Sequence, residues 1–382
     1  MLNDQTLVHI AQTHGTPTYI YDLDRVITNI QYLRQMLPDA DILYAVKANP
    51  NGAILKHLST QGVGAEAITL GELERSVRAG IDPNKIILGG PRQDLDLIHK
   101  ALELGITQVS LDSTSQWQTW KDIAAPSVWF YPRVNPALDP KTHEHLATGV
   151  ATSKFGMTPQ EARGVAEELS ECKQLAGFHV HAGSQITEAS VYDDIFAVLA
   201  PLYESFRPKH LDIGGGFGVP GFPFEIFADK VLEFSKRFNL HLTIEPGRYL
   251  VAEAGVLLSK VLHLKQGALN HVIADAGMSD LLRPALYGAT HPIRVIGKSA
   301  NVFVADIDGP LCENADRLGR GLELPVLEMG DLLVIEQAGA YGHTMSSNYA
   351  SSYRPAEVTV QGKTIRLVRR RETIDDLLAL EV

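Results

Sequence analysis

The sequence has little cysteine, no long run of basic residues and no apolar run that approaches the length of a membrane span. Its two cysteines, Cys172 and Cys312, lie far apart among 382 residues, so we expect free thiols in a cytoplasmic protein. The net charge of −11 argues against nucleic acid or an anionic membrane as a partner. Residues Met1 to Gly15 mix Asp, Gln and His with apolar residues, which is not the pattern of a signal peptide.

What the chain does contain is enough apolar material for a large core. The residues are 45% hydrophobic, with 32 glycines and 20 prolines, and the length suggests about two domains. From residue 42 onward, short β-type runs alternate with amphipathic segments. The runs predicted as strands are Ile42–Val46, Val63–Ile68, Ile86–Leu88, Gln108–Leu111, Val128–Val134, Gly177–His181, His210–Ile213 and Leu240–Glu245.

Eight strand and helix alternations within this length predict a (β/α)8 barrel over residues 22–250, an α/β fold. An open doubly wound sheet is the alternative. After Pro246 the pattern becomes strands and turns with little helix, which predicts a second, β-rich domain over residues 251–382. The segment Pro17 to Tyr21 precedes the barrel, and we expect residues 1–21 to join this second domain.

One lysine stands at the end of the first predicted strand, in Tyr44-Ala45-Val46-Lys47-Ala48-Asn49-Pro50. Lysine is costly to bury unless it is paired or used, and a desolvated lysine is a nucleophilic amine. A lysine at a strand end is also commonly a wetted surface residue. Both interpretations of Lys47 remain open from this segment alone.

Other polar and small residues follow the later strands, at the edge where a barrel places its active site. They are His181 with Gly183 and Ser184, the glycine cluster Gly214 to Gly218, and Glu245 with Gly247 and Arg248. The glycines would let backbone N–H groups approach a phosphate, although a plain tight turn is the alternative.

Three simpler interpretations compete with a cofactor site at these positions. Residues 216–221 read Gly-x-Gly-x-x-Gly, but the motif follows the seventh strand and Pro220 interrupts it, which argues against a dinucleotide fold. His179 and His181 share a strand face, but no third ligand follows at a recognised spacing, so we expect no metal. Glu245 and Arg248 could form an ordinary salt bridge.

Taken together, these motifs resemble the pyridoxal-phosphate-dependent group IV decarboxylases, whose barrel is of the alanine-racemase type. Further motifs are similar to those of diaminopimelate decarboxylases. They are Arg133-Val134-Asn135-Pro136, Ser153-Lys154-Phe155-Gly156, Arg283-Pro284-Ala285-Leu286-Tyr287-Gly288, Gly309-Pro310-Leu311-Cys312-Glu313 and Ala338-Gly339-Ala340-Tyr341-Gly342. The resemblance extends from Pro17 to about Val360. Two positions depart from the usual pattern, Glu66 and Gln337, where relatives have Asp. Neither is a principal cofactor or substrate contact in the family, so the departures bear on the identity of the substrate rather than on the chemistry.

The resemblance implies a role for each motif residue. Lys47 would bind pyridoxal 5'-phosphate covalently, His181 would stack on its ring, and Glu245 would keep the ring nitrogen protonated. Cys312 would return a proton to the substrate carbon, and in this family it comes from the other subunit of a homodimer with shared active sites. The remaining implied cofactor contacts are Ser184, Gly215, Gly216, Gly247, Arg248 and Tyr341.

For the substrate, the resemblance implies meso-2,6-diaminopimelate, converted to L-lysine and CO2 in the last step of lysine biosynthesis. Arg248, Arg283 and Tyr287 would bind its distal carboxylate, Glu313 its distal amine, and Tyr341 would reach both substrate and cofactor. The alternatives are the same chemistry on carboxynorspermidine or a carrier-bound amino acid, and an inactive homologue that binds a regulatory partner. Lys47 and Cys312 argue against the last, and Cys312-Glu313 argues against an alanine racemase.

Overall fold

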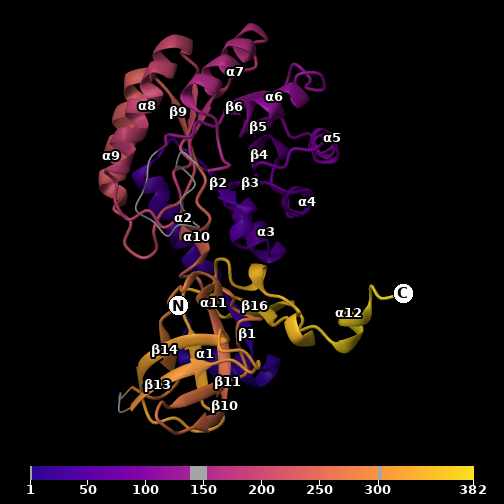
Figure 1. Ribbon diagram of the computed structural model, residues 1–382, viewed down its shortest axis with the longest axis vertical. Helices are drawn as coiled ribbons and strands as arrows, with labels where there is room; N and C mark the ends of the chain where they lie inside the picture. Colours follow the sequence, from indigo (N-terminus) through magenta and orange to yellow (C-terminus); the bar gives the residue numbers. More distant parts are fainter. Residues whose placement is uncertain (1, 138–152, 300–302) are drawn as a thin grey trace. The chain divides into compact units, whose positions relative to one another are not determined.

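The computed structural model describes residues 2–137, 153–299 and 303–382 (Figure 1). Its internal contacts divide the chain into two compact units, Asn29–Tyr249 and Met1–Thr28 with Leu250–Val382. The domain limits 22–250 and 251–382 with 1–21 stay a prediction about separately folding parts. No helix in the described ranges is long and apolar enough to cross a membrane.

An eight-stranded parallel sheet forms the unit Asn29–Tyr249, in the order β6-β5-β4-β3-β2-β9-β8-β7. Bridges from Phe130 to Leu175 and from Arg133 to His179 bring β6 beside β7 and nearly close the sheet. The predicted (β/α)8 barrel is therefore confirmed over the open doubly wound sheet. The strands are β2 (Asp41–Ala45), β3 (Gly64–Ala67), β4 (Ile86–Leu88), β5 (Gln108–Leu111), β6 (Trp129–Pro132), β7 (Gly177–His179), β8 (His210–Asp212) and β9 (His241–Ile244).

Helices follow these strands because their apolar positions recur at helical spacing and their ends carry capping groups. The helix α7 begins at Pro159 behind Thr158, whose side chain and that of Glu161 each accept a backbone N–H in a capping box. The helices between the strands are α3 (Gly52–Thr60), α4 (Leu70–Arg78), α5 (Leu95–Glu103), α6 (Thr114–Trp120), α7 (Pro159–Glu171), α8 (Val191–Phe206) and α9 (Phe224–Phe238), with α2 (Leu23–Met36) before the barrel and α10 (Arg248–Val251) after it.

The other unit is a nine-stranded mixed sheet, which confirms the β-rich second part of the chain. The predicted strand at Pro17–Tyr21 is β1 (Thr18–Asp22), which pairs antiparallel with β10 (Gly255–Lys265) and parallel with β16 (Ala356–Gln361). Its other strands are β11 (His271–Ala274), β12 (Ile293–Val295), β13 (Phe303–Asp308), β14 (Arg317–Leu324), β15 (Leu332–Ile335) and β17 (Thr364–Arg369), with short helices α11 (Arg283–Tyr287) and α12 (Ile374–Leu378).

Among the elements of this unit that the sequence pattern did not reveal are one strand and one longer helix. The strand β14 pairs with β13, but two glycines and several charged residues hide any alternation. The helix α1 (Asp4–His14) buries only Leu7 and Ile10, which pack into a core with Ile20 and Leu258. The sequence pattern also predicts a strand at Val302–Ile307; this strand is β13, except that Val302 lies outside the described residues.

Candidate active site

The carboxyl ends of four barrel strands gather the residues that the sequence singled out. Lys47 lies two residues after β2, His181 two after β7, Gly214 two after β8, and Glu245 directly after β9. Because β7, β8, β9 and β2 are consecutive parallel neighbours, these residues meet at one edge of the barrel.

Lys47 sits on a single 3-10 turn, Val46–Ala48, and its Nζ lies 2.5 Å from Glu66 Oε2. The lysine side chain is 37% exposed and the glutamate side chain 7% exposed. Lys47 is thus paired and partly exposed, which lies between the two interpretations that its sequence segment left open. Glu66 is the direct ionic partner of Lys47, a pairing that the sequence did not predict.

His181 is held by the backbone of the glycine segment. The N–H of Gly215 donates to His181 Nδ1 over 3.1 Å, so the proton of a neutral ring is on Nε2. Crowding by protein atoms, together with the charges of Arg133 and Lys47, lowers the pKa of His181 well below its usual value. The ring is therefore neutral at physiological pH.

The first three glycines of the segment after β8, Gly214 to Gly216, have no room for side chains. A Cβ on Gly216, whose φ is +92°, would lie 2.0 Å from the carbonyl oxygen of Gly183. A Cβ on Gly215 would lie 2.2 Å from the carbonyl oxygen of Glu245. The backbone here is packed against the segments after β7 and β9, which leaves a peptide chain without side chains beside His181.

Glu245 belongs to a buried polar cluster that the sequence did not predict as a unit. Its Oε2 lies 3.4 Å from His179 Nε2, and His179 Nδ1 shares a 2.6 Å hydrogen bond with Ser110 Oγ. Burial alone would raise the pKa of Glu245, but His179 and Lys47 lower it to about 2. Asp212, which is completely buried, completes the cluster. Its proximity to Glu245 has no sequence signal because the two residues are on different strands.

The last two predicted residues of this edge, Ser184 and Arg248, lie in contact. The Arg248 Nη2 atom donates to Ser184 Oγ over 3.4 Å, and Arg248 is 9% exposed. Gly247 lets this loop approach the lysine segment, since a Cβ there would stand 3.1 Å from the Cβ atoms of Ala45 and Ala48. The described ion pairs place His179 beside Glu245.

The five remaining predicted residues lie in the β-rich unit, and four of them are on two of its segments. Arg283 begins α11 and is 8% exposed. Its Nη1 donates to His291 Nε2 over 3.0 Å. His291 Nδ1 in turn donates to the carbonyl oxygen of Glu336 over 2.9 Å. Tyr287 ends the same helix. Cys312 and Glu313 are exposed on the turn between β13 and β14, and Glu313 accepts a hydrogen bond from the Tyr349 hydroxyl.

The turn that carries Cys312 and Glu313 is organised by Asp316, a residue that the sequence did not single out. Its carboxylate accepts the N–H of Met278 over 2.5 Å and that of Leu311 over 2.7 Å. Gly309 and Gly277 are needed beside it, because a Cβ on either would come within 2.3 Å of its oxygens. The fifth predicted residue, Tyr341, has a φ of +56° and follows the Gly339-Ala340 turn.

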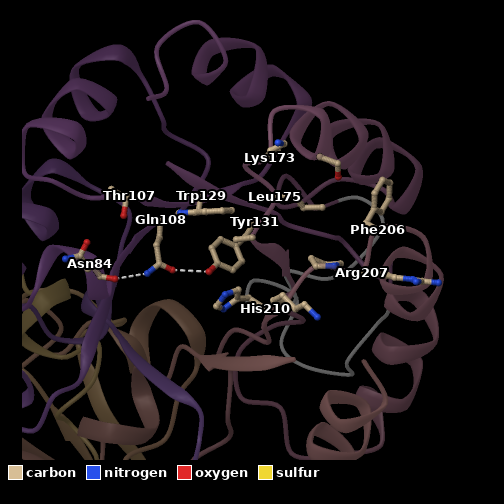
Figure 2. A pocket seen from close by; sticks show the side chains of 14 residues that line it. Asn84, Thr107, Gln108, Trp129, Tyr131, Lys173, Leu175, Phe206, Arg207 and His210 are labelled. Atoms are coloured by element: carbon tan, nitrogen blue, oxygen red, sulfur yellow. Dashed lines mark hydrogen bonds between the residues drawn. The ribbon is translucent and has the colours of Figure 1, made fainter. Parts of the chain in front are cut away.

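A cavity of about 690 Å³ lies at the opposite end of the barrel strands (Figure 2). Its lining includes Gln108, Trp129 and His210, each of which begins a strand, and Tyr131 donates to Gln108 Oε1 over 3.0 Å. Among the described residues, the lining contains none of the predicted site residues. Since barrel chemistry takes place at the carboxyl ends of the strands, the candidate active site is the edge with Lys47 and not this cavity.

Residues 23–252 match the family described as pyridoxal-dependent decarboxylase, pyridoxal binding domain. The residues at the carboxyl ends of β2, β7, β8 and β9 fit pyridoxal phosphate. Glu245 Oε1 is buried without a hydrogen-bond partner among the described residues, so it can accept from a ring nitrogen. The bare Gly215-Gly216 backbone suits a phosphate, and Lys47 supplies an amine.

The chain is also similar to individual decarboxylases over its full length. It is 40% identical to the diaminopimelate decarboxylase of Deinococcus radiodurans over 383 residues, covering 100% of both chains. It is 37% identical to that of Aquifex aeolicus, covering 97% of this chain and 92% of the other. A crystal structure of the diaminopimelate decarboxylase of Helicobacter pylori complexed with L-lysine matches with a TM-score of 0.92, at 33% identity and 98% coverage of both chains. The chain therefore belongs to the diaminopimelate decarboxylases, within the pyridoxal-dependent decarboxylase family.

Proposed function

We propose that this chain removes CO2 from meso-2,6-diaminopimelate to give L-lysine, the last step of lysine biosynthesis, with pyridoxal 5'-phosphate as its cofactor. One observation carries the proposal: Lys47, His181, the Gly215-Gly216 backbone and Glu245 meet at one edge of the barrel. The chain is also similar to diaminopimelate decarboxylases over its full length. The cofactor supplies an electron sink for the electron pair that stays on the α-carbon when CO2 leaves.

Residues of the chain would hold pyridoxal phosphate in complementary ways. Lys47 would provide the amine that binds the cofactor covalently, and Glu66 keeps that amine at the end of β2 through its 2.5 Å ion pair. The N–H groups of Gly215 and Gly216, with the hydroxyl of Ser184, would bind the phosphate. His181 is neutral and partly exposed, which suits a ring that lies against the cofactor without adding a positive charge.

Glu245 would set the protonation of the cofactor ring. Its low pKa keeps it ionised, and a buried carboxylate with a free oxygen favours a protonated partner. Gly247 lets the loop of Arg248 approach Lys47, and Arg248 and Tyr341 would complete the contacts to the cofactor. These assignments follow the motif positions.

Cys312 would donate a proton to the α-carbon after CO2 has left, as a cysteine of tunable pKa can do. Its exposure on the β13–β14 turn is consistent with a residue that serves the site of a second copy of the chain. We propose a homodimer in which each active site takes Lys47 from one copy and Cys312 with Glu313 from the other.

The distal end of the substrate explains the remaining residues. A carboxylate there would pair with Arg283, which His291 holds in place, together with Tyr287 and Arg248. The distal ammonium would pair with Glu313. An amine that lacks the distal carboxylate would leave Arg283 without its anion, which disfavours ornithine and other monocarboxylates.

The substrate assay compares four compounds on the purified protein with added cofactor: meso-diaminopimelate, carboxynorspermidine, ornithine and arginine. We expect CO2 release to be fastest from meso-diaminopimelate. Faster release from carboxynorspermidine would leave the cofactor chemistry intact and contradict the substrate. Absence of release from all four, with cofactor bound, would favour a regulatory homologue.

A further inference from the structure

The buried cluster behind Glu245 contains an excess of unsatisfied polar atoms. Among the described residues, His179 Nε2, Asp212 Oδ2 and Glu245 Oε1 are each buried without a hydrogen-bond partner. One atom from each of these three side chains lies within 4.8 Å of the others. Orphan buried atoms are rare and costly, so three in one cluster call for an explanation.

The cluster also brings carboxylates close together in a buried place. Asp212 is 0% and Glu245 5% exposed, and Glu66 contributes a further negative charge to the field at Asp212. Lys47 is already paired with Glu66. Two ionised carboxylates side by side in a buried site repel strongly, and such pairs hold one proton between them.

The proton belongs on Asp212 rather than on Glu245. His179 faces Glu245 at 3.4 Å and favours its ionised form. The Gly214 N–H reaches Asp212 Oδ1 over 2.9 Å, which by itself favours an ionised Asp212 and leaves Oδ2 as the oxygen that can carry a proton. Burial, and then the charge of Glu245, raise the pKa of Asp212 well above its usual value. The remaining oxygen, Oδ2, has no partner among the described residues.

We propose that Asp212 is a positioning residue that stays protonated and donates through Oδ2 to Glu245, so that Glu245 remains ionised with Oε1 available to the cofactor ring. The inference rests on the proposed cofactor site and adds a residue to it. The Ser110–His179 hydrogen bond of 2.6 Å fixes the imidazole that lies 3.4 Å from the same carboxylate. Glu245 is then held by two neighbours, Asp212 and His179, neither of which is proposed to contact the substrate.

The first test measures the proton directly, by infrared spectroscopy of the holoenzyme with isotope-labelled aspartate at about pH 8.5. We expect a neutral carboxylic acid band that disappears in Asp212→Asn. Asp280→Asn is the matched control: burial raises the pKa of Asp280 to about 7, so that acid is ionised at this pH and its removal should leave the band unchanged. A wild-type spectrum without the band, or a band that survives Asp212→Asn, would overturn the proposal.

The second test compares two replacements of Asp212. Asparagine keeps an acceptor for the Gly214 N–H and a neutral donor toward Glu245, whereas leucine keeps neither. We expect Asp212→Asn to hold the dissociation constant for pyridoxal phosphate within about threefold of wild type, and Asp212→Leu to raise it at least about tenfold. If Asp212 were instead an ionised partner of His179, asparagine would be as damaging as leucine, and that result would also overturn the proposal.

Neither readout depends on the substrate. A protein that binds the cofactor and shows the Asp212 proton but releases no CO2 from diaminopimelate would refute the proposed substrate and leave this inference standing. Thermal melting of each apoprotein checks folding, and if Asp212→Leu does not fold, the infrared band and the asparagine variant still decide the question. A stoichiometric metal ion in the purified protein, lost on Asp212→Asn, would contradict a proton at this place.

Discussion

At the scale of single residues, the site depends on partners that fix each reactive group. Lys47 is held by Glu66, Glu245 lies against His179, and Arg283 lies against His291. The sequence predicted the reactive member of each pair but not its partner. Partners such as Glu66 and Ser110 come from other strands, and only the closed barrel brings them within bonding distance.

The specificity residues give a prediction at this scale. Arg283→Ala and Glu313→Gln should each lower kcat/KM for meso-diaminopimelate by roughly 30-fold or more, because a desolvated charge pair is worth about 2–5 kcal/mol when one partner is removed. Steady-state kinetics of CO2 release would measure this.

The cofactor content of both variants should stay that of wild type, since neither residue is proposed to bind the cofactor. Arg320→Ala, an exposed arginine on β14, serves as the control and should leave kcat/KM unchanged. Equal kinetics for Arg283→Ala and wild type would remove this arginine from the proposed substrate site.

At the scale of elements, the strand ends and the loops after them decide where chemistry can occur. The eight barrel strands were predictable because runs rich in β-branched and apolar residues are separated by turn residues and amphipathic helices. Their ends differ from prediction by a few residues, as at β7, which ends at His179 and leaves His181 in the following loop. The strand β14 and the role of Asp316 were not predictable, since the former lacks alternation and the latter acts on backbone N–H groups distant in sequence.

The glycine segment after β8 allows a sharp test of close packing. Gly216→Ala should lower the affinity for pyridoxal phosphate at least about tenfold, because the new Cβ would lie 2.0 Å from the Gly183 carbonyl oxygen and force the backbone to move. Equilibrium titration of the apoprotein with cofactor would measure the change.

Gly221→Ala is the matched control, with a similar φ of +90° and, in the described ranges, no atom within 4 Å of the new Cβ. It should cost only backbone strain, about 1–2 kcal/mol of stability, and leave cofactor affinity intact. If both variants lost the same affinity for pyridoxal phosphate, backbone strain would explain the loss, and the close packing of the proposed phosphate-binding segment would not.

At the scale of the whole molecule, the two units carry different parts of the proposed chemistry. The barrel holds Lys47, His181 and Glu245, while the β-rich unit holds Cys312, Glu313, Arg283 and Tyr341. Family membership was predictable from motif order along the chain, whereas the assembly of the site from two copies stays a prediction. Cytoplasmic location also stays a prediction.

Mixing two inactive variants tests the shared site. In a heterodimer of Lys47→Ala and Cys312→Ala, one site would combine both mutations and the other would be intact. Random exchange should therefore restore about one quarter of wild-type activity, since half of the dimers are mixed and half of their sites work. No recovery, with subunit exchange shown by tagged copies, would mean that each chain completes its own site.

The most direct measurement of the central claim is to locate the covalent bond between the protein and pyridoxal phosphate. Borohydride makes that bond irreversible, and peptide mass spectrometry then identifies the lysine that carries it. We expect the label on Lys47 alone, and no label in Lys47→Ala, which should also lose all decarboxylation. A label on a different lysine, or full activity in Lys47→Ala, would contradict the assignment of the active site to this edge of the barrel.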